Sequence, residues 1–283
     1  MARLARLLAG IALVALLGMG AAACGGGGGS GGGADKTAGL TAEQLLTQSS
    51  AAAKQLKSFR VSLEAKGTAN VPASGGGGIG DLLKGPINIS GEGPVEPPDK
   101  ASLDAKINLS GLPLQGNITR VGDAVYVGFL GQDFKVNLPP AQVALFDFGS
   151  LYPTLASWAK NPTIAGREDI DGTSTVKVDA ALDPTAALQA LGPALGIEGI
   201  TAAQAKSALK TGRFEAWIGT EDLLPRRVHV ILAATGAKLA PGVGAIDLDL
   251  TVDLSAFDEP VDITAPANAK PLNLNDLGSL VGG

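Results

Sequence analysis

The segment from Arg213 to Ala234 constrains the fold most, because its side chains alternate between apolar and polar residues in two runs. The first run extends from Arg213 to Ile218 and the second from Arg227 to Leu232. A side-chain period of two is typical of β-strands with one buried face. The residues between the runs include Pro225, which lacks a backbone N–H and suits a turn. The segment therefore predicts an antiparallel hairpin with one continuous apolar face.

Similar alternating segments account for most of the remaining chain. Short strands that recur about every 8–12 residues indicate a large antiparallel meander. Gly116, Gly128 and Gly131 lie in or beside these strands, where glycine permits strong bending. The sequence therefore predicts the fold class α+β with a strongly curved antiparallel sheet. The further strands are expected within residues 59–66, 87–89, 101–109, 114–120, 124–129, 134–138, 166–169, 173–182 and 246–254.

Helices are expected in three places. Thr41 and Gln44 have the spacing of a capping box, which predicts a helix from there to about Lys57. Asp183 followed by Pro184 matches an N-cap residue and the first helical position of a second helix. A third helix is expected over 201–209, and residues 141–161 are expected to be helical or irregular and to end at Asn161-Pro162.

The first 23 residues have the features of an export signal peptide. Arg3 and Arg6 precede an apolar run over 7–17 that is too short to span a bilayer comfortably. Cys24, the only cysteine, follows three alanines. This junction resembles a bacterial lipobox, in which the cysteine thiol receives a diacylglycerol. Ordinary signal cleavage nearby, leaving a free thiol, is the alternative.

The expected organisation after the signal peptide has three parts. Residues 24–39 carry the lipidated cysteine and a glycine-rich leash with a reach of roughly 20–24 Å. Residues 40–270 form the folded domain, and residues 271–283 form a C-terminal tail. Within the domain, the glycine run at 75–80 is expected to be a mobile loop or a flexible lid.

Several motifs resemble the LppX/LprA/LprF/LprG family of actinobacterial envelope lipoproteins, which is distantly similar to the LolA lipoprotein carriers. The resemblance covers about residues 40–267. It implies a half-open β-barrel, with helices packed across the concave face and a hydrophobic cavity for acylated lipids or glycolipids between the two. The motifs, in chain order, are Cys24, Gly122-Asp123 before Val125-Tyr126-Val127, Ile170-Asp171-Gly172-Thr173, Trp217-Ile218, Leu224-Pro225-Arg226-Arg227 and the segment 257–266 (FDEPVDITAP).

The apolar faces of the expected strands supply the candidate lining of this lipid cavity. The same alternation would also arise in an ordinary filled core, so a hollow interior and a packed interior both remain open. A composition with 4% aromatic residues leaves few bulky rings to fill a hollow. The candidate lining residues are Phe59, Val61, Leu63, Leu103, Ile107, Ile118, Val125, Val127, Phe129, Phe214, Ile218, Val228, Val230, Leu232, Ile246, Leu248 and Leu250.

Catalytic, metal and nucleic-acid sites find little support in the sequence. His229 is the only histidine and is expected on a polar strand face without a partner. One histidine and one acylatable cysteine cannot form a common zinc site, and the sequence has no G-x-S-x-G nucleophile elbow. No catalytic residue, metal or cofactor is expected, although the scattered Asp and Glu residues leave a catalytic carboxylate pair open. A net charge of −5 without a Lys/Arg run disfavours nucleic-acid binding. Arg226 and Arg227 are expected to be solvated surface residues, with contact to lipid headgroups or a partner as the alternative.

The expected function is that of an exported protein, lipid-anchored at the outer face of the cell membrane, which carries acylated lipids or glycolipids across the envelope. The expected partners are its lipid ligand, the membrane and a membrane lipid transporter. The alternative is an anchored interaction or sensor module that assists a membrane transporter without carrying lipid itself.

Overall fold

The computed structural model describes the folded part of the chain and several loops around it. The described residues are 34–69, 85–109, 112–129, 131–138, 143, 146–191, 199–239 and 243–272. The signal peptide, Cys24 and the glycine run at 75–80 lie outside them.

One twelve-stranded sheet forms the framework of the domain, in the order β12-β6-β5-β4-β3-β2-β1-β11-β10-β9-β8-β7. All neighbours pair antiparallel except β12 and β6, which are parallel. The strands are β1 (Phe59–Ala69), β2 (Pro86–Glu96), β3 (Lys100–Leu109), β4 (Leu112–Val121), β5 (Ala124–Phe129), β6 (Gln132–Val136), β7 (Ala159–Ile170), β8 (Thr173–Leu182), β9 (Leu209–Gly219), β10 (Pro225–Thr235), β11 (Ala245–Ser255) and β12 (Lys270–Leu272).

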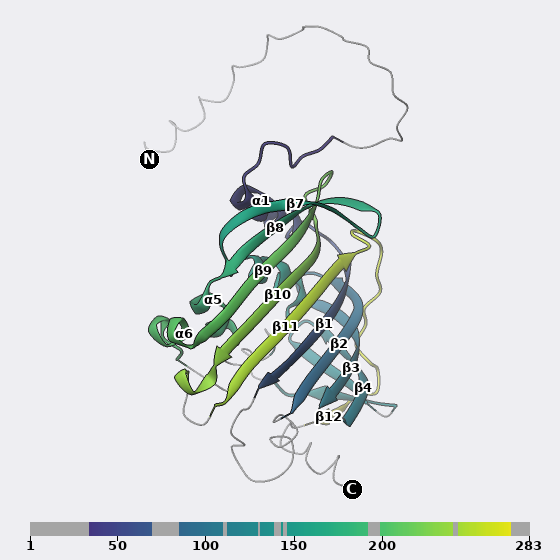
Figure 1. Cartoon of the computed structure of the whole chain (residues 1–283). Helices are drawn as coiled ribbons and strands as arrows, with labels where there is room; N and C mark the ends of the chain where they lie inside the picture. Colours follow the sequence, from purple (N-terminus) through teal and green to yellow (C-terminus); the bar gives the residue numbers. More distant parts are fainter. Residues whose placement is uncertain are drawn as a thin grey trace, which may run out of the picture. The chain divides into compact units, whose positions relative to one another are not determined.

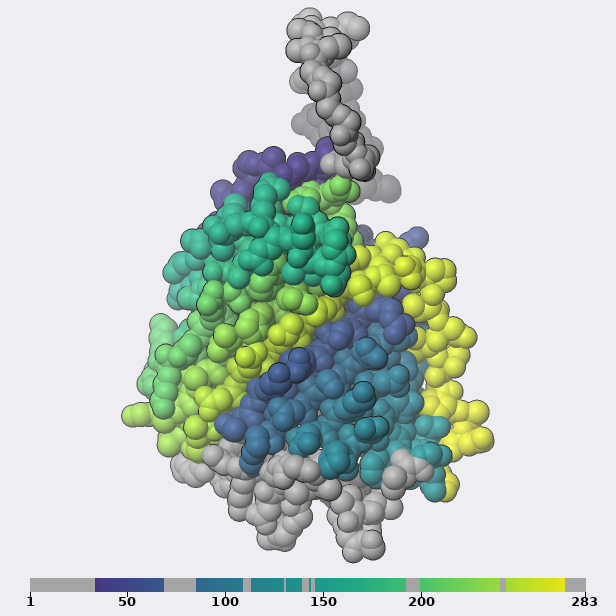
Figure 2. All heavy atoms as spheres, turned by 45° about the vertical axis from the view of Figure 1, so that its right-hand side comes forward, coloured from purple at the N-terminus to yellow at the C-terminus, as the bar shows by residue number. Residues whose placement is uncertain are grey.

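The predicted hairpin is confirmed and lies between β11 and β8. β9 and β10 pair with Phe214 opposite Val230 and Ala216 opposite Val228. The centre of the sheet joins two ends of the sequence, since β1 pairs with β11 over ten residues from Arg60 opposite Ser255 to Ala69 opposite Ile246. In Figure 2 the yellow strip of β11 runs beside the dark blue strip of β1.

The sheet bends strongly where neighbouring strands approach too closely for a side chain. A Cβ atom on Gly93 would lie 1.9 Å from the carbonyl oxygen of Ser102, and one on Gly116 would lie 2.3 Å from that of Gly128. Only glycine permits this approach, which is a common device for curving a sheet. The predicted α+β fold with a curved antiparallel sheet is therefore what the structure has.

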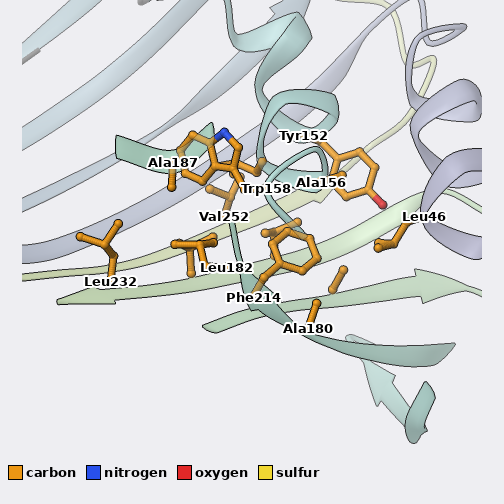
Figure 3. Close-up of a cluster of buried hydrophobic side chains, with 14 of the residues drawn as sticks. Leu46, Tyr152, Ala156, Trp158, Ala180, Leu182, Ala187, Phe214, Leu232 and Val252 are labelled. Atoms are coloured by element: carbon orange, nitrogen blue, oxygen red, sulfur yellow. The ribbon is translucent and has the colours of Figure 1, made fainter. Parts of the chain in front are cut away.

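Short helices pack on the face of the sheet that carries Phe59, Val61 and Phe214, which we call the concave face. α1 and α4 are joined by a buried hydrogen bond of 2.8 Å from the Tyr152 hydroxyl to Ser49 Oγ. Figure 3 shows Phe214 beneath Tyr152 and Trp158 in this core. The helices are α1 (Ala42–Ala53), α4 (Leu151–Ala156), α5 (Pro184–Leu191) and α6 (Ala202–Ala208), with 3-10 turns η2 (Phe148–Ser150) and η4 (Gly236–Lys238).

The predicted helix starts are confirmed by their capping contacts. Thr41 and Gln44 form both hydrogen bonds of a capping box at the start of α1. Oδ1 of Asp183 accepts from the backbone N–H groups of Thr185 and Ala186 at the start of α5. Each contact satisfies a backbone donor that the first helical turn leaves unpaired.

The prediction that residues up to Asn161-Pro162 are helical or irregular is wrong beyond Trp158. β7 begins at Ala159 and contains both residues. Register shifts between Lys160 and Thr163 and between Ile164 and Gly166 accommodate them. β7 is an edge strand, where proline and bulges are tolerated and hinder pairing with other chains.

The described domain packs beyond both boundaries expected from the sequence. Asp35 Oδ2 pairs with Arg167 Nη2 at 2.7 Å, and Thr37 is buried. The N–H of Lys36 donates to the carbonyl of Thr220. The contacts of the domain therefore begin before residue 40, within the expected leash, and β12 extends them to Leu272, past the expected boundary at 270.

Candidate functional site

The concave face brings together all the apolar residues predicted to line a cavity, but it divides them into two groups. The first group is almost completely buried. Except for Val125, it lies in one continuous core with side chains of α1, α4, α5 and α6. Its members, with their exposed fractions, are Phe59 (3%), Val61 (2%), Leu103 (2%), Val125 (1%), Phe214 (0%), Ile218 (0%), Val228 (0%), Val230 (0%), Leu232 (1%) and Ile246 (3%).

The second group is only half-buried and lies farther along the same strands. On β3 the buried Leu103 is followed on the same face by the half-buried Ile107, and on β5 the buried Val125 is followed by Val127. The register of the sheet places Ile118 beside both Leu103 and Val127, so the group is continuous across strands. We call it the apolar strip: Leu63, Ile107, Ile118, Val127, Phe129, Leu248 and Leu250.

An apolar cavity of about 260 Å³ opens at the end of this strip. It lies between β1, β2, β11 and the end of α5, where Leu191 contributes. Its apolar wall includes three residues that were not among the predicted lining, namely Ala65, Ile87 and Ile89. They follow the same alternation as Leu63 and Ile107, so the signal for them was present in the sequence. Ile246 and Leu248, both predicted, complete this wall.

The larger hollow, of about 620 Å³, lies on the opposite, convex face and is polar. Its lining includes Glu92, Asp104, Lys106, Asn117 and Asp133. These charged and amide side chains cannot replace the contacts that an acyl chain has in a bilayer. The apolar surface suited to a lipid chain is therefore on the concave face.

The convex face carries a network of charged residues around Glu215, whose side chain is 8% exposed. Lys177 Nζ and Arg213 Nη2 lie 2.9 and 2.7 Å from its Oε1, and His229 Nδ1 lies 2.8 Å from its Oε2. Burial raises the pKa of Glu215, but hydrogen bonds from Lys177 and His229 outweigh it and hold that pKa below its usual range. The hydrogen bond to Glu215 raises the pKa of Lys177.

Two predictions about this face are wrong. His229 has partners, since its Nε2 also lies 2.9 Å from Asp249 Oδ1. Arg226 and Arg227 are not free surface residues. Arg226 pairs with Asp222 and stacks over Phe257, whereas Arg227 forms a two-pronged pair with Asp253 at 2.5 and 3.1 Å. Alternation placed Arg227 and His229 on a polar face but could not show which charges oppose them.

Two further features are absent from the residues that the structure describes. No group of three or more His, Cys, Asp or Glu side chains there is arranged to hold a metal ion. In the same part of the chain, no helix is long and apolar enough to cross a membrane.

Comparison with known proteins gave similarity to solved structures only. No protein-family model and no curated protein matches the chain. LprF from Mycobacterium bovis is 19% identical with a TM-score of 0.49, over 80% of this chain and 97% of that one. LppX from Mycobacterium tuberculosis is 19% identical with a TM-score of 0.46, over 78% and 98%. A LolA-superfamily protein from Nitrosomonas europaea is 11% identical with a TM-score of 0.30, over 78% and 96%. The predicted resemblance is thus confirmed to the extent that LprF and LppX, two members of the LppX/LprA/LprF/LprG family, are among the structures to which this chain is similar.

Proposed function

We propose that this chain is an exported lipoprotein that binds acylated lipids or glycolipids along its apolar strip and carries them across the cell envelope. The observation that carries the proposal is the division of the concave face. Val61, Leu103 and Val125 are at most 2% exposed, whereas Leu63, Ile107 and Val127 on the same strands are half-buried. A filled core of ordinary density would bury both sets.

The energetics of lipid transfer explain why such a surface is needed. Removing a 16-carbon chain from a bilayer costs on the order of 12 kcal/mol, at ~0.8 kcal/mol per CH₂. A carrier must return most of this free energy through apolar contact. The apolar strip and the adjoining cavity of about 260 Å³ offer a continuous surface across β1 to β5 and β11 for that purpose.

The proposal includes an anchor at the outer face of the cell membrane, through a diacylglycerol on Cys24. It also includes a membrane lipid transporter as a partner that supplies or receives the ligand. The domain provides the binding surface, and the residues before Ala34 provide the attachment.

The test is to identify lipid that co-purifies with the exported Cys24→Ser chain, by mass spectrometry of organic extracts. We expect acylated lipid in about equimolar amount, since one continuous strip offers one binding surface. An extract free of lipid, from protein that melts cooperatively, would contradict the proposal. If that lipid-free protein captured a membrane transporter, the alternative of an anchored interaction module would replace it.

A further inference from the structure

A charged side chain lies among the apolar residues on the β3–β5 part of the concave face. Arg120 is opposite Ala101 on β3 and Val125 on β5, which are 2% and 1% exposed. The other described concave positions of β1 to β5 are apolar residues or glycines. The side chain of Arg120 is itself 12% exposed. A buried arginine needs compensating partners, because its charge cannot be removed at any ordinary pH.

Among the described residues, Arg120 has one close partner and two more distant ones. Nε donates to the carbonyl of Gly122 at 3.0 Å, which fixes the orientation of the guanidinium. Nη1 lies 3.5 Å from the carbonyl of Phe146 and 3.8 Å from Oδ1 of Asp147. Charge-assisted bonds of this type are usually about 2.7–2.9 Å long. Within the described residues, Nη2 has no hydrogen-bond partner.

The nearest carboxylate is engaged elsewhere. Asp147 caps η2, with Oδ1 accepting from the N–H of Ser150 at 3.3 Å and Oδ2 accepting from its hydroxyl at 2.6 Å. The contrast with Arg227, held by both oxygens of Asp253 at 2.5 and 3.1 Å, indicates that Arg120 is not built as half of a structural ion pair.

We infer that Arg120 binds an anionic oxygen, of a phosphate or carboxylate, in the headgroup of the lipid ligand. This inference rests on the proposed function and adds a substrate class to it, namely acylated lipids whose headgroup has an anionic oxygen. A guanidinium held at Nε presents its remaining donors in a fixed fork that matches phosphate and carboxylate. The apolar surroundings strengthen such a contact relative to water.

The position of Arg120 suits this role. Ile118, two residues before it on the same face of β4, belongs to the apolar strip. From Arg120 to Leu114, which lies opposite Ile107, β4 advances about 20 Å. A headgroup held at Arg120 would therefore let an acyl chain follow the strip toward the cavity beside Ala65 and Leu248.

The experiment measures uptake by the full chain carrying Cys24→Ser from vesicles that contain phosphatidylglycerol, phosphatidylcholine or diacylglycerol with identical acyl chains. We expect the protein with native Arg120 to prefer the two phospholipids, each of which has an anionic phosphate oxygen, about tenfold over diacylglycerol, since a hydrogen bond to a charged group is of that strength. Arg120→Gln should lower the uptake of both phospholipids to the level of diacylglycerol and leave the uptake of diacylglycerol unchanged. Asp147→Asn should retain or increase the preference, because it removes the competing carboxylate.

A purely structural Arg120 predicts a different pattern. Arg120→Gln and Asp147→Asn would then lower the melting temperature together and leave the lipid preference unchanged, which would overturn the inference. Arg120→Lys, which retains the charge without the fork, should lose part of the preference and covers the case in which Arg120→Gln does not fold.

The remaining outcomes separate this inference from the proposed function. Equal uptake of all three lipids by the protein with native Arg120 overturns the role of Arg120 alone. Uptake of none of them overturns the proposed function as well. Saturable binding of inorganic phosphate that requires Arg120, without a preference among the vesicles, would assign the site to a free anion and also contradict the inference.

Discussion

Nδ1 of His229 lies 2.8 Å from Oε2 of Glu215, and the two residues face each other across the β9–β10 pair. The same imidazole reaches Asp249 on β11 at 2.9 Å. His229 therefore links three adjacent strands on the convex face, opposite the face that carries the apolar strip. Its role is in the stability of the sheet.

We expect His229→Ala to lower the free energy of unfolding by about 1–2 kcal/mol, because it removes two hydrogen bonds, one of them exposed. The loss is limited because Glu215 keeps Lys177 and Arg213. Bound lipid should stay within about twofold, because the substitution is on the far side of the sheet. Urea unfolding and lipid quantification test both points, with Thr251→Ala as a convex-face control. Loss of lipid at unchanged stability would contradict this assignment.

The lowered pKa of Glu215 makes stability depend on pH in a defined direction. A carboxyl whose folded pKa is depressed stabilises the protein above its unfolded pKa, about 4.3, and loses that contribution as pH falls through the folded value. Glu215→Gln should therefore cost about 2 kcal/mol at pH 7, and the difference from wild type should shrink below about pH 4.

Urea unfolding between pH 7 and pH 3 measures this difference. Glu64→Gln is the matched control, because Glu64 and its partner Lys66 are 59% and 61% exposed. It should change stability by less than about 0.5 kcal/mol. A deficit of Glu215→Gln that stays constant over the whole pH range would contradict the assigned electrostatic role.

The hydrogen bond from Tyr152 to Ser49 joins α4 to α1 in the interior. Tyr152→Phe should cost about 1–2 kcal/mol, because it leaves the Ser49 hydroxyl buried without this partner. Adding Ser49→Ala should restore part of the loss, since no polar group then remains unpaired. Equal effects of the single and double variants in thermal unfolding would argue against a coupled pair.

Cys24→Ser tests the proposed anchor. Wild-type protein should partition into the detergent phase after export, and Cys24→Ser should move to the aqueous phase with an unchanged melting temperature. The variant should keep its fold because the described contacts of the domain begin at Asp35. Wild-type protein found wholly in the aqueous phase would contradict lipidation.

Much of the fold could be predicted because alternation and capping are local signals. The β9–β10 hairpin, the capping box at Thr41 and the cap at Asp183 depend on residues close together in the sequence. The pairing of β1 with β11 could not be predicted, because alternation assigns a face to each residue but not a neighbour to each strand. The prediction that regular structure breaks at Asn161-Pro162 was wrong for a related reason, since residues that suit a turn also suit a bulge at a sheet edge.

The sequence predicted which face of the sheet carries the candidate site, but not which residues of that face remain partly exposed. Val61 and Leu63 have the same side-chain chemistry and the same parity, yet Val61 is 2% exposed and Leu63 is only half-buried. Burial of this kind depends on tertiary packing, which periodicity does not contain. The surroundings of Arg120 could not be predicted for the same reason. A charged residue at the end of a strand does not indicate that it will lie opposite Ala101 and Val125.

The division of the concave face can be tested by placing the same large side chain on either side of it. Val230 is 0% exposed inside the helix-covered core, whereas Val127 is half-buried in the apolar strip beside Ile118. Val230→Trp should cost about 3 kcal/mol or more, because a close-packed core has no room for the ring. Val127→Trp should cost less than about 1 kcal/mol, because its ring can occupy space otherwise available to an acyl chain.

The most direct test of lipid binding on the apolar strip is the amount of lipid that co-purifies with Val127→Trp relative to wild type. The proposed function predicts a fall to below about half, with the two melting temperatures within a few degrees of each other. Equal lipid content in the two proteins, or a wild type that carries none, would contradict it.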